Sequence, residues 1–244
     1  MIQAYLTNIK ELLIKLETAP ENNSLRMAAD KITESISKGG IVHVFGCGHS
    51  HILGEEVFYR AGGLVPVRPI LVDELMLHKG ALQSSTLERS HDYASSFLSK
   101  QDIRQEDSLI VVSTSGRNPV PIDVALHGKQ QGAFVVGITS LDYSKNQTSR
   151  HKSGKFLCDA VDLVIDNYAK PGDGVLSLSE SGLSFGPSSS IIGLTIINSI
   201  MVGAINRLLE LGLDPPIFKS GNIDGSDEHN QKLIEQYKDR ITMF

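Results

Sequence analysis

The sequence contains no tryptophan and only two cysteines, Cys47 and Cys158, in 244 residues. Two isolated cysteines cannot form the disulfide framework of a small secreted protein, and the segment around each is typical of the end or edge of a buried strand. No positively charged segment precedes an apolar run, and no apolar stretch of about 18 residues stands out, so neither a signal peptide nor a membrane span is predicted. A cytoplasmic protein is the resulting expectation.

The chain also lacks a surplus of positive charge. It carries 23 Lys and Arg against 28 Asp and Glu, which gives a formal net charge of −5 and a pI near 5.9. Nucleic acids and anionic membranes normally bind basic surfaces, so neither is expected as a partner. With 41% hydrophobic residues the chain is long enough to bury a full α/β core.

Hydrophobic periodicity predicts a pair of N-terminal helices, broken at Ala19-Pro20, and then strands and helices in alternation. Strands are predicted near residues 41–45, 64–71, 108–112, 133–139 and 161–166, and helices near residues 51–61, 119–131 and 188–211. Strands separated by helices of this length pair in parallel through right-handed crossovers. The expected fold is therefore α/β and doubly wound, with a five-stranded parallel sheet flanked by helices and an N-terminal helical hairpin.

Three segments follow from this pattern: N-terminal helices over residues 1–38, a central domain over 39–212, and a C-terminal tail with a short helix over 213–244. Within the central domain, residues 142–155 and 167–187 are predicted as long loops that serve as lids or subunit contacts. The helix near 188–211 is apolar on nearly all sides, which predicts that it is buried in an oligomer core. We expect a homodimer or homotetramer.

Two short loops rich in glycine and hydroxyl groups each connect a predicted strand to a helix. Residues 46–50 read Gly-Cys-Gly-His-Ser, and residues 113–116 read Ser-Thr-Ser-Gly. Such loops present backbone N–H groups and hydroxyls at the positive end of a helix, which suits a phosphate group, and loops after parallel strands meet at one sheet edge. Ordinary helix capping by serine is the alternative. The predicted ligand-binding residues are Gly48, His49, Ser50, His51, Ser113, Thr114, Ser115, Gly116 and Asn118.

Neither loop completes a nucleotide-binding motif. The dinucleotide fingerprint needs glycine at position 51, where the chain has His51, and no Gly-Lys-Ser/Thr follows Gly46 as a P-loop requires. No cofactor is therefore predicted. His43, His49 and His51 raise the alternative of a metal, but no cysteine or carboxylate completes a ligand set at a usual spacing, and no metal is predicted.

The two loops together resemble those of the sugar isomerase (SIS) domain family, whose members bind phosphosugars. Residues 45–50 resemble the first phosphate loop of the family and residues 113–118 the second, with matching features over about residues 40–210. Residues 115–121 and 225–230 resemble signatures of the uncharacterised UPF0309 group, some members of which carry the name phosphoheptose isomerase. The chain departs from the catalytic members at Asn118, where they usually carry threonine or serine, although an asparagine amide can also donate to an oxyanion.

An aldose–ketose isomerase needs a base that moves a proton between adjacent carbons, and Glu or His can be tuned to this task. Glu55 and Glu56 follow the first loop and are the leading candidates for the base. In heptose-type relatives the base lies further along this helix, where the chain has Tyr59 or Arg60. The alternative is a solvated helix face.

Two further groups of candidates lie elsewhere in the chain. Glu74 and His78 follow the second strand, one helical turn apart, and resemble a segment of arabinose-phosphate-type isomerases in which an acidic residue and a histidine lie close to the substrate. His229 lies in the polar tail and is predicted to reach a neighbouring crevice, since SIS active sites commonly form between subunits. A charged surface turn and a helix cap at Ser226 or Asp227 are the respective alternatives.

The resemblance implies a cytoplasmic phosphosugar-binding homo-oligomer that isomerises a sugar phosphate without a redox cofactor. A non-catalytic phosphosugar sensor is an alternative, although no helix-turn-helix segment precedes the domain. Lyase or etherase chemistry on an amino-sugar phosphate is another, because it would use the same phosphate loops with a different base.

Overall fold

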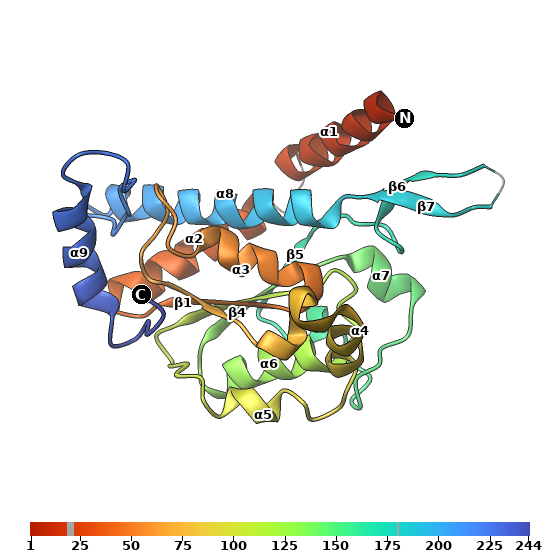
Figure 1. Cartoon of the computed structure of the whole chain (residues 1–244), viewed down its shortest axis with the longest axis horizontal. Coiled ribbons are helices and arrows are strands. Elements are labelled where there is room, and N and C mark those ends of the chain that lie inside the picture. The colour runs from red at the N-terminus through yellow and green to blue at the C-terminus, as the bar shows by residue number, and fades with distance from the viewer. Residues whose placement is uncertain (19–21, 180) are drawn as a thin grey trace.

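Strands made of buried aliphatic residues form a parallel sheet at the centre of the fold. A computed structural model describes residues 1–18, 22–179 and 181–244 (Figure 1). The strands are β1 (Val42–Gly46), β2 (Val67–Ile70), β3 (Ser108–Val112), β4 (Phe134–Thr139) and β5 (Leu163–Asp166). They pair in parallel in the order β2-β1-β3-β4-β5. β1 and β3 are buried at every position, as expected of strands covered on both faces. The predicted five-stranded parallel sheet is confirmed.

Helices cover both faces of this sheet (Figure 1). One face carries α2 (Asn22–Ser37), α3 (Ile52–Val57) and α8 (Ser189–Glu210), and the other carries α4 (Leu77–Glu88), α5 (Ser95–Leu98) and α6 (Pro119–Gln130). Successive side chains of β1 alternate between the two, with Val42 and Val44 packed under α8 and Phe45 packed under the α5–α6 layer. The result is the predicted doubly wound arrangement.

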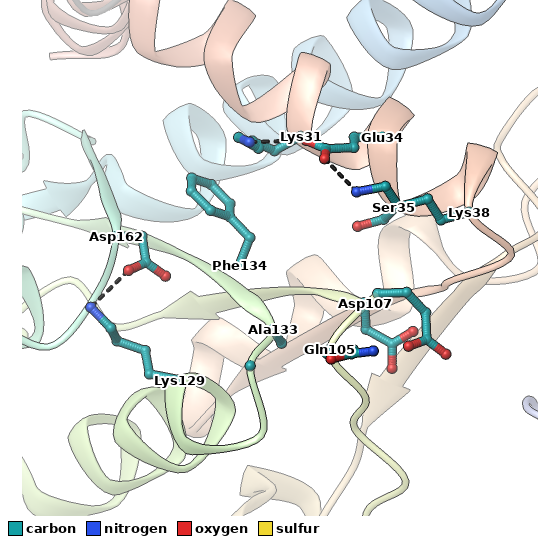
Figure 2. A pocket seen from close by; sticks show the side chains of 12 residues that line it. Lys31, Glu34, Ser35, Lys38, Gln105, Asp107, Lys129, Ala133, Phe134 and Asp162 are labelled. Atoms are coloured by element: carbon teal, nitrogen blue, oxygen red, sulfur yellow. Dashed lines mark hydrogen bonds and ion pairs between the residues drawn. The ribbon is translucent and has the colours of Figure 1, made fainter.

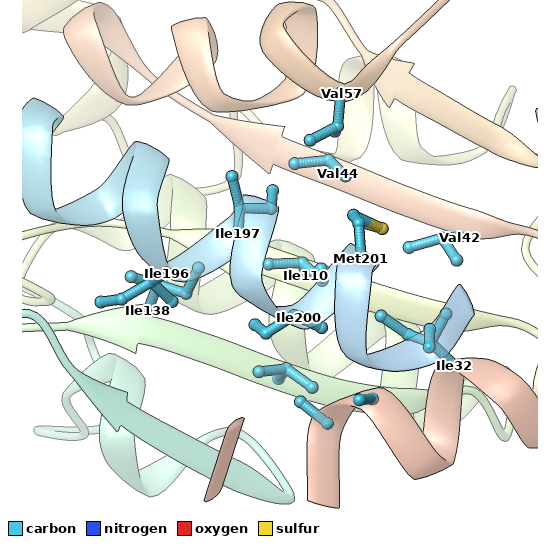
Figure 3. Close-up of a cluster of buried hydrophobic side chains, with 14 of the residues drawn as sticks. Ile32, Val42, Val44, Val57, Ile110, Ile138, Ile196, Ile197, Ile200 and Met201 are labelled. Atoms are coloured by element: carbon cyan, nitrogen blue, oxygen red, sulfur yellow. The ribbon is translucent and has the colours of Figure 1, made fainter. Parts of the chain in front are cut away.

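Helix α8 is the centre of the first layer (Figure 3). By length and composition it is a candidate membrane span, contrary to the expectation that no stretch reaches that length. Its apolar side chains, however, pack against the sheet: Ile196, Ile197 and Ile200 are fully buried among Val44, Ile110 and neighbouring side chains. A helix that packs on the core of a folded domain can have this length and composition.

Ile200 provides a test of this packing. We expect Ile200→Ala to lower the free energy of unfolding by about 3 kcal/mol, because it removes a buried side chain and leaves a cavity. Val202 on the same helix is 65% exposed, and Val202→Ala is expected to change stability by less than about 0.5 kcal/mol. Urea denaturation measures both. A loss below about 1 kcal/mol for Ile200→Ala would contradict the packing, and an equal loss at Val202 would place that side of the helix in a subunit interface.

The N-terminal helix and a β-hairpin project from the body together (Figure 1). The helix is α1 (Ile2–Thr18), and β6 (Gly174–Ser177) pairs antiparallel with β7 (Ser184–Pro187). The Tyr5 hydroxyl donates to the Pro187 carbonyl at 2.7 Å. The prediction of a long loop over residues 167–187 is therefore wrong, since most of it is this hairpin. The predicted break at Ala19-Pro20 lies outside the described residues.

Local boundaries differ from the predictions in three other places. The helix predicted near 51–61 consists of a 3-10 turn, η1 (Gly48–His51), and a short α3 that ends before Tyr59, which has a positive φ of 48°. Helix α7 (Leu141–Asn146) occupies the first part of the predicted loop 142–155, and the 3-10 turn η3 (Leu157–Asp159) follows that loop. Cys158 therefore lies in a turn, not at a strand edge. Helices α4 and α5, with the 3-10 turn η2 (Asp73–Leu75) before them, were not predicted.

The C-terminal tail packs at the amino ends of the strands. Tyr237 at the end of helix α9 (Ser226–Tyr237) packs with Phe218 and Ile241 against Ile41, which directly precedes β1. Ile217 also pairs with Leu64, ahead of β2. The tail is thus docked on the sheet, although the proposed division at residues 38 and 212 stays a prediction.

A buried ion network, here called the C-terminal clasp, ties this tail down through Arg240 and Asp107. Arg240 Nη2 lies 2.7 Å from Asp107 Oδ2, and the Asp107 side chain has no exposed surface. Asp107 also accepts hydrogen bonds from the backbone N–H groups of Ile41 and Arg104 and contacts His43 Nε2 at 3.2 Å. Burial by itself raises the pKa of Asp107, but these hydrogen bonds outweigh it and hold the pKa below 3.8.

Candidate functional site

The two glycine- and hydroxyl-rich loops start side by side at the carboxyl edge of the sheet. They follow β1 and β3, which are adjacent strands, and Gly46 at the end of β1 pairs with Val112 at the end of β3. The strand order reverses here, because β2 lies on the far side of β1 from β3. After β1 the chain continues to α3 on one face of the sheet, and after β3 it continues to α6 on the other face. Doubly wound sheets bind ligands in the crevice at such a switch point.

The first loop depends on a glycine at position 46. A Cβ atom on Gly46 would lie 2.5 Å from the backbone of Ser50, well inside van der Waals contact. The loop turns back tightly enough for the Ser50 N–H to donate to the Cys47 carbonyl at 3.0 Å, and Gly48 has a positive φ of 55°. The half-buried Ser50 hydroxyl makes no hydrogen bond to another described residue. It is therefore available to a ligand.

The second loop is held rigidly by its neighbours. Thr114 accepts hydrogen bonds at its carbonyl from the Ser140 N–H, at 2.9 Å, and at its hydroxyl from the Asn167 amide, at 3.1 Å. The Ser113 hydroxyl accepts the Gly116 N–H at 3.2 Å. Ser113 and Thr114, both predicted as phosphate ligands, thus hold the loop in shape.

Ser115 is the residue of this loop whose hydroxyl is free in the described structure. Gly116 beside it has a φ of +58°, and a Cβ there would lie 2.6 Å from Thr139 Oγ1, so glycine is required to turn the chain. Helix α6 begins with Pro119 and has a second proline at position 121, and neither has an N–H to offer. The groups that this loop can offer to a ligand are therefore mainly the Ser115 hydroxyl and the helix dipole.

Asn118 does not cap the helix that it precedes. Its amide donates to Glu88 Oε1 at 3.0 Å, and its carbonyl oxygen accepts from Arg150 Nη1 at 3.0 Å. The Asn118 side chain is only 7% exposed. Its role in the structure is to join the end of α4, the second loop and the segment after α7.

Glu88 is a half-buried carboxylate that contacts the second loop and that no motif marks. Burial raises its pKa above the ordinary 4.5 and outweighs the opposing effects of the Asn118 hydrogen bond and of Arg89 and Arg150. Glu88 in turn adds to the effect of burial in raising the pKa of Cys47, the first residue after β1. A carboxylate perturbed in this way at the carboxyl edge of a parallel sheet is typical of functional sites.

Glu55 and Glu56 have partners of their own. Glu55 is exposed, and its Oε1 lies 3.7 Å from His51 Nε2. Glu56 is 3.2 Å from Arg60 Nη1 and accepts a hydrogen bond from the Asn198 amide of α8, also at 3.2 Å. Both lie on α3 and line a hollow at its outer surface with Tyr59 and Arg60. Their predicted role as base stays a prediction.

Glu74 and His78 lie on the outer surface at the start of the α4 segment. Glu74 is in η2, His78 is in the first turn of α4, and both are exposed. Leu77 next to His78 is close to Gly48, at 3.7 Å from the position of a Cβ there. The segment therefore lies over the first loop.

His229 lies at the other end of the sheet within its own chain. Its Nε2 is 2.9 Å from the carbonyl oxygen of Ile217, in the tail that packs at the amino ends of the strands. Its predicted role concerns a neighbouring subunit and stays a prediction.

The three histidines around the first loop do not converge. His43 is buried against Asp107, His49 is exposed, and His51 bonds to the Gly48 carbonyl and approaches Glu55. Among the residues that the structure describes, no three His, Cys, Asp or Glu side chains are grouped to hold a metal ion.

A cavity of about 430 Å³ lies at the amino end of the sheet, away from the loops (Figure 2). Lys31 and Lys38 of α2 both bind Glu34, and Lys129 binds Asp162. The three lysines of this cavity are thus paired with carboxylates. The two loops stay the predicted phosphate site.

Comparison with protein families identifies the chain. The family described as SIS domain matches residues 4–140. The chain belongs to the SIS domain family. It is 58% identical over 244 residues to a UPF0309 protein of Halalkalibacterium halodurans, covering 100% of this chain and 97% of the relative. It is 54% identical to a UPF0309 protein of Geobacillus thermodenitrificans over 100% and 98% of the two chains. It is thus a UPF0309 member of the family.

Solved structures show the same fold at low sequence identity. The phosphoheptose isomerase of Neisseria gonorrhoeae matches with a TM-score of 0.55 and 12% identity, over 84% of this SIS chain and 97% of that one. The Vibrio vulnificus NanR protein, complexed with ManNAc-6P, matches with a TM-score of 0.53 and 15% identity over 97% and 68%. These likenesses confirm the SIS fold and no more than the fold.

Proposed function

We propose that this chain binds a sugar phosphate at the two loops and interconverts its aldose and ketose forms. The observation that carries the proposal is the pairing of two tight loops at the switch point, each with a free serine hydroxyl, Ser50 and Ser115. Hydroxyls and backbone N–H groups near helix N-termini suit a phosphate group. SIS-fold neighbours whose names include a phosphoheptose isomerase and a ManNAc-6P complex support the same ligand class.

The proposed ligand contacts divide into two kinds. Ser50 and Ser115 bind the phosphate directly, helped by the backbone of Gly48, His49, His51 and Gly116, while Ser113, Thr114 and Asn118 hold the second loop in shape. The aldose–ketose step needs a base and a ring-opening acid. Glu55 or Glu56 is the base expected from the sequence, and His78 or His229 is the expected acid, with Glu74 as the acidic neighbour of His78.

A thermal-shift experiment tests the binding. The purified protein is screened against glucose 6-phosphate, sedoheptulose 7-phosphate and N-acetylmannosamine 6-phosphate, with the unphosphorylated sugars as controls. A ligand at 100 times its Kd adds about 2.7 kcal/mol, which corresponds to a rise in Tm of roughly 5–10 °C. Ser50→Ala and Ser115→Ala are expected to abolish the shift and Ser220→Ala to keep it. Equal shifts with unphosphorylated sugars would contradict a phosphate site.

Turnover separates the proposed enzyme from the alternative functions. NMR of each stabilising sugar phosphate is expected to show the ketose or aldose partner as product. Binding without turnover, unchanged by substitution of Glu55, Glu56, Glu74 or His78, favours a phosphosugar sensor. Release of an ether substituent or of an elimination product favours the lyase or etherase alternative.

We also propose that the protein works as a homodimer or homotetramer in the cytoplasm. Exposed apolar side chains gather on α1, on the β6–β7 hairpin and on α8, and a second copy of the chain is the proposed cover. They are Met1, Ile2, Leu6, Leu178, Leu183, Phe185 and Ile191. Surfaces of this kind on a projecting arm are typical of subunit contacts.

A further inference from the structure

We infer that Glu88 is the acid–base group that carries the proton between the two reacting carbons of the bound sugar phosphate. This inference rests on the proposed function and assigns its central step to a residue outside the sequence-predicted set. It follows from the position of Glu88 relative to both loops, from its burial, and from the partners already held by the other glutamates.

The position of Glu88 is defined by its helix and by its contact with the second loop. It is the last residue of α4, which packs against η1 of the first loop and against α6 after the second loop. Its Oε1 is 3.0 Å from the amide nitrogen of Asn118 in the second loop. Its charge acts on the thiol of Cys47 in the first loop. The carboxylate thus contacts the second loop directly and lies within electrostatic range of the first.

The surroundings of Glu88 fit proton transfer. One of its oxygens is bound to the Asn118 amide, and the Asn118 carbonyl is in turn held by Arg150, so the carboxylate is oriented through a chain of hydrogen bonds. Arg89 and Arg150 lie within electrostatic reach of it. Burial raises the pKa of Glu88, which brings its protonated and ionised forms closer in free energy near neutral pH. A group that both takes and returns a proton needs both forms to be accessible. Glu55 and Glu56, by contrast, are exposed or bound to side chains of α3 and α8.

The step itself is balanced without a redox cofactor. The Glu88 carboxylate takes the proton from C2 of the open-chain aldose, the C–H electron pair forms a C1–C2 double bond, and the C1 carbonyl becomes an enediolate oxygen. Protonated Glu88 then delivers its proton to C1. The C2 hydroxyl becomes the carbonyl, and its proton passes to the oxygen on C1, which gives the ketose.

Solvent exchange tests this assignment. The wild-type protein, Glu88→Gln, Glu55→Gln, Glu56→Gln and the control Glu210→Gln are incubated in D₂O with the same three sugar phosphates. Binding is followed by thermal shift, and deuterium incorporation at C1 or C2 is followed by NMR. Glu88→Gln is expected to keep binding and to lose exchange by 10²- to 10⁴-fold, while Glu210→Gln, on the exposed end of α8, exchanges at the wild-type rate.

The outcomes separate this inference from the proposed function. Wild-type binding with wild-type exchange in Glu88→Gln overturns the role of Glu88, as does loss of exchange in Glu55→Gln or Glu56→Gln alone. Binding without exchange in the wild type overturns it too and leaves the phosphosugar site standing. Failure of all three probes to bind overturns the proposed function and this inference with it.

The pH profile of the wild type gives a second measurement that needs no variant. If Glu88 is the base, the acidic limb of kcat/KM lies above 4.5, because burial raises the pKa of the free enzyme's carboxyl. A limb at or below 4.5 contradicts the assignment even if Glu88→Gln does not fold. Glu88→Asp, which keeps the carboxylate but withdraws it by one methylene, is expected to retain partial exchange.

Discussion

Gly46→Ala is expected to abolish sugar-phosphate binding. The new methyl group would lie 2.5 Å from the Ser50 carbonyl group, so the chain must move where the first loop turns back on itself. The Ser50 backbone cannot move aside as a flexible side chain can. Relieving the clash therefore displaces the Ser50 hydroxyl and the start of η1. We expect the Kd to rise at least 100-fold, equivalent to about 2.7 kcal/mol of binding free energy.

Isothermal titration with the sugar phosphate that gives the largest thermal shift measures this change. Gly221→Ala is the matched control, because Gly221 has no atom within 4 Å of the new methyl group and no positive φ. Circular dichroism of both variants checks that the helices remain. A Gly46→Ala protein that binds within threefold of the wild type would show that the ligand does not depend on the first loop.

Arg240→Met is expected to lower the free energy of unfolding by roughly 3 kcal/mol, because it leaves the buried Asp107 carboxylate without its cationic partner. Asp107 keeps its hydrogen bonds from two backbone N–H groups, but the compensating charge is lost. Arg104→Met is the control, because Arg104 forms its ion pair with Asp102 at the surface, with half of each side chain exposed. Such pairs contribute about 0–1 kcal/mol.

Urea denaturation at several pH values checks the prediction and its sign. The pKa of Asp107 is lowered in the folded state, so the stability that its ionised form contributes is present above 3.8 and is lost as the pH falls through the folded pKa. The difference between Arg240→Met and the wild type should therefore be full near pH 7 and shrink below pH 3.8. Equal losses of unfolding free energy in Arg240→Met and Arg104→Met would mean that the buried ion pair of the clasp contributes no more to stability than a surface pair.

The strands were predictable because burial on both faces leaves continuous aliphatic runs, as in residues 41–45 and 108–112. Helix α4 was not, because Ser84 is its only described buried residue and its polar surface has no helical apolar period. The β6–β7 hairpin was missed for a similar reason: its strands are short and partly exposed, and their glycine and serine content is typical of loops.

The residues of the site divide in the same way, into those with a local sequence pattern and those without one. Ser50 and Ser115 could be found because a phosphate loop is a local feature, written in consecutive residues between a strand and a helix. Glu88 could not, because its environment is made by a contact with Asn118, 30 residues away, through a helix that the pattern does not reveal. Asn118 itself was expected to bind ligand, and only its neighbours in space show that its side chain is already engaged.

The C-terminal clasp has a consequence for the lifetime of the folded state. Arg240 and Asp107 are 133 residues apart, so their contact closes a long loop, and contacts of this kind are expected to form late in folding. If the contact forms after the folding transition state, its loss accelerates unfolding without slowing folding. We therefore expect the clasp to lengthen the time a molecule stays native, and it does so at the end of the sheet opposite to the ligand loops.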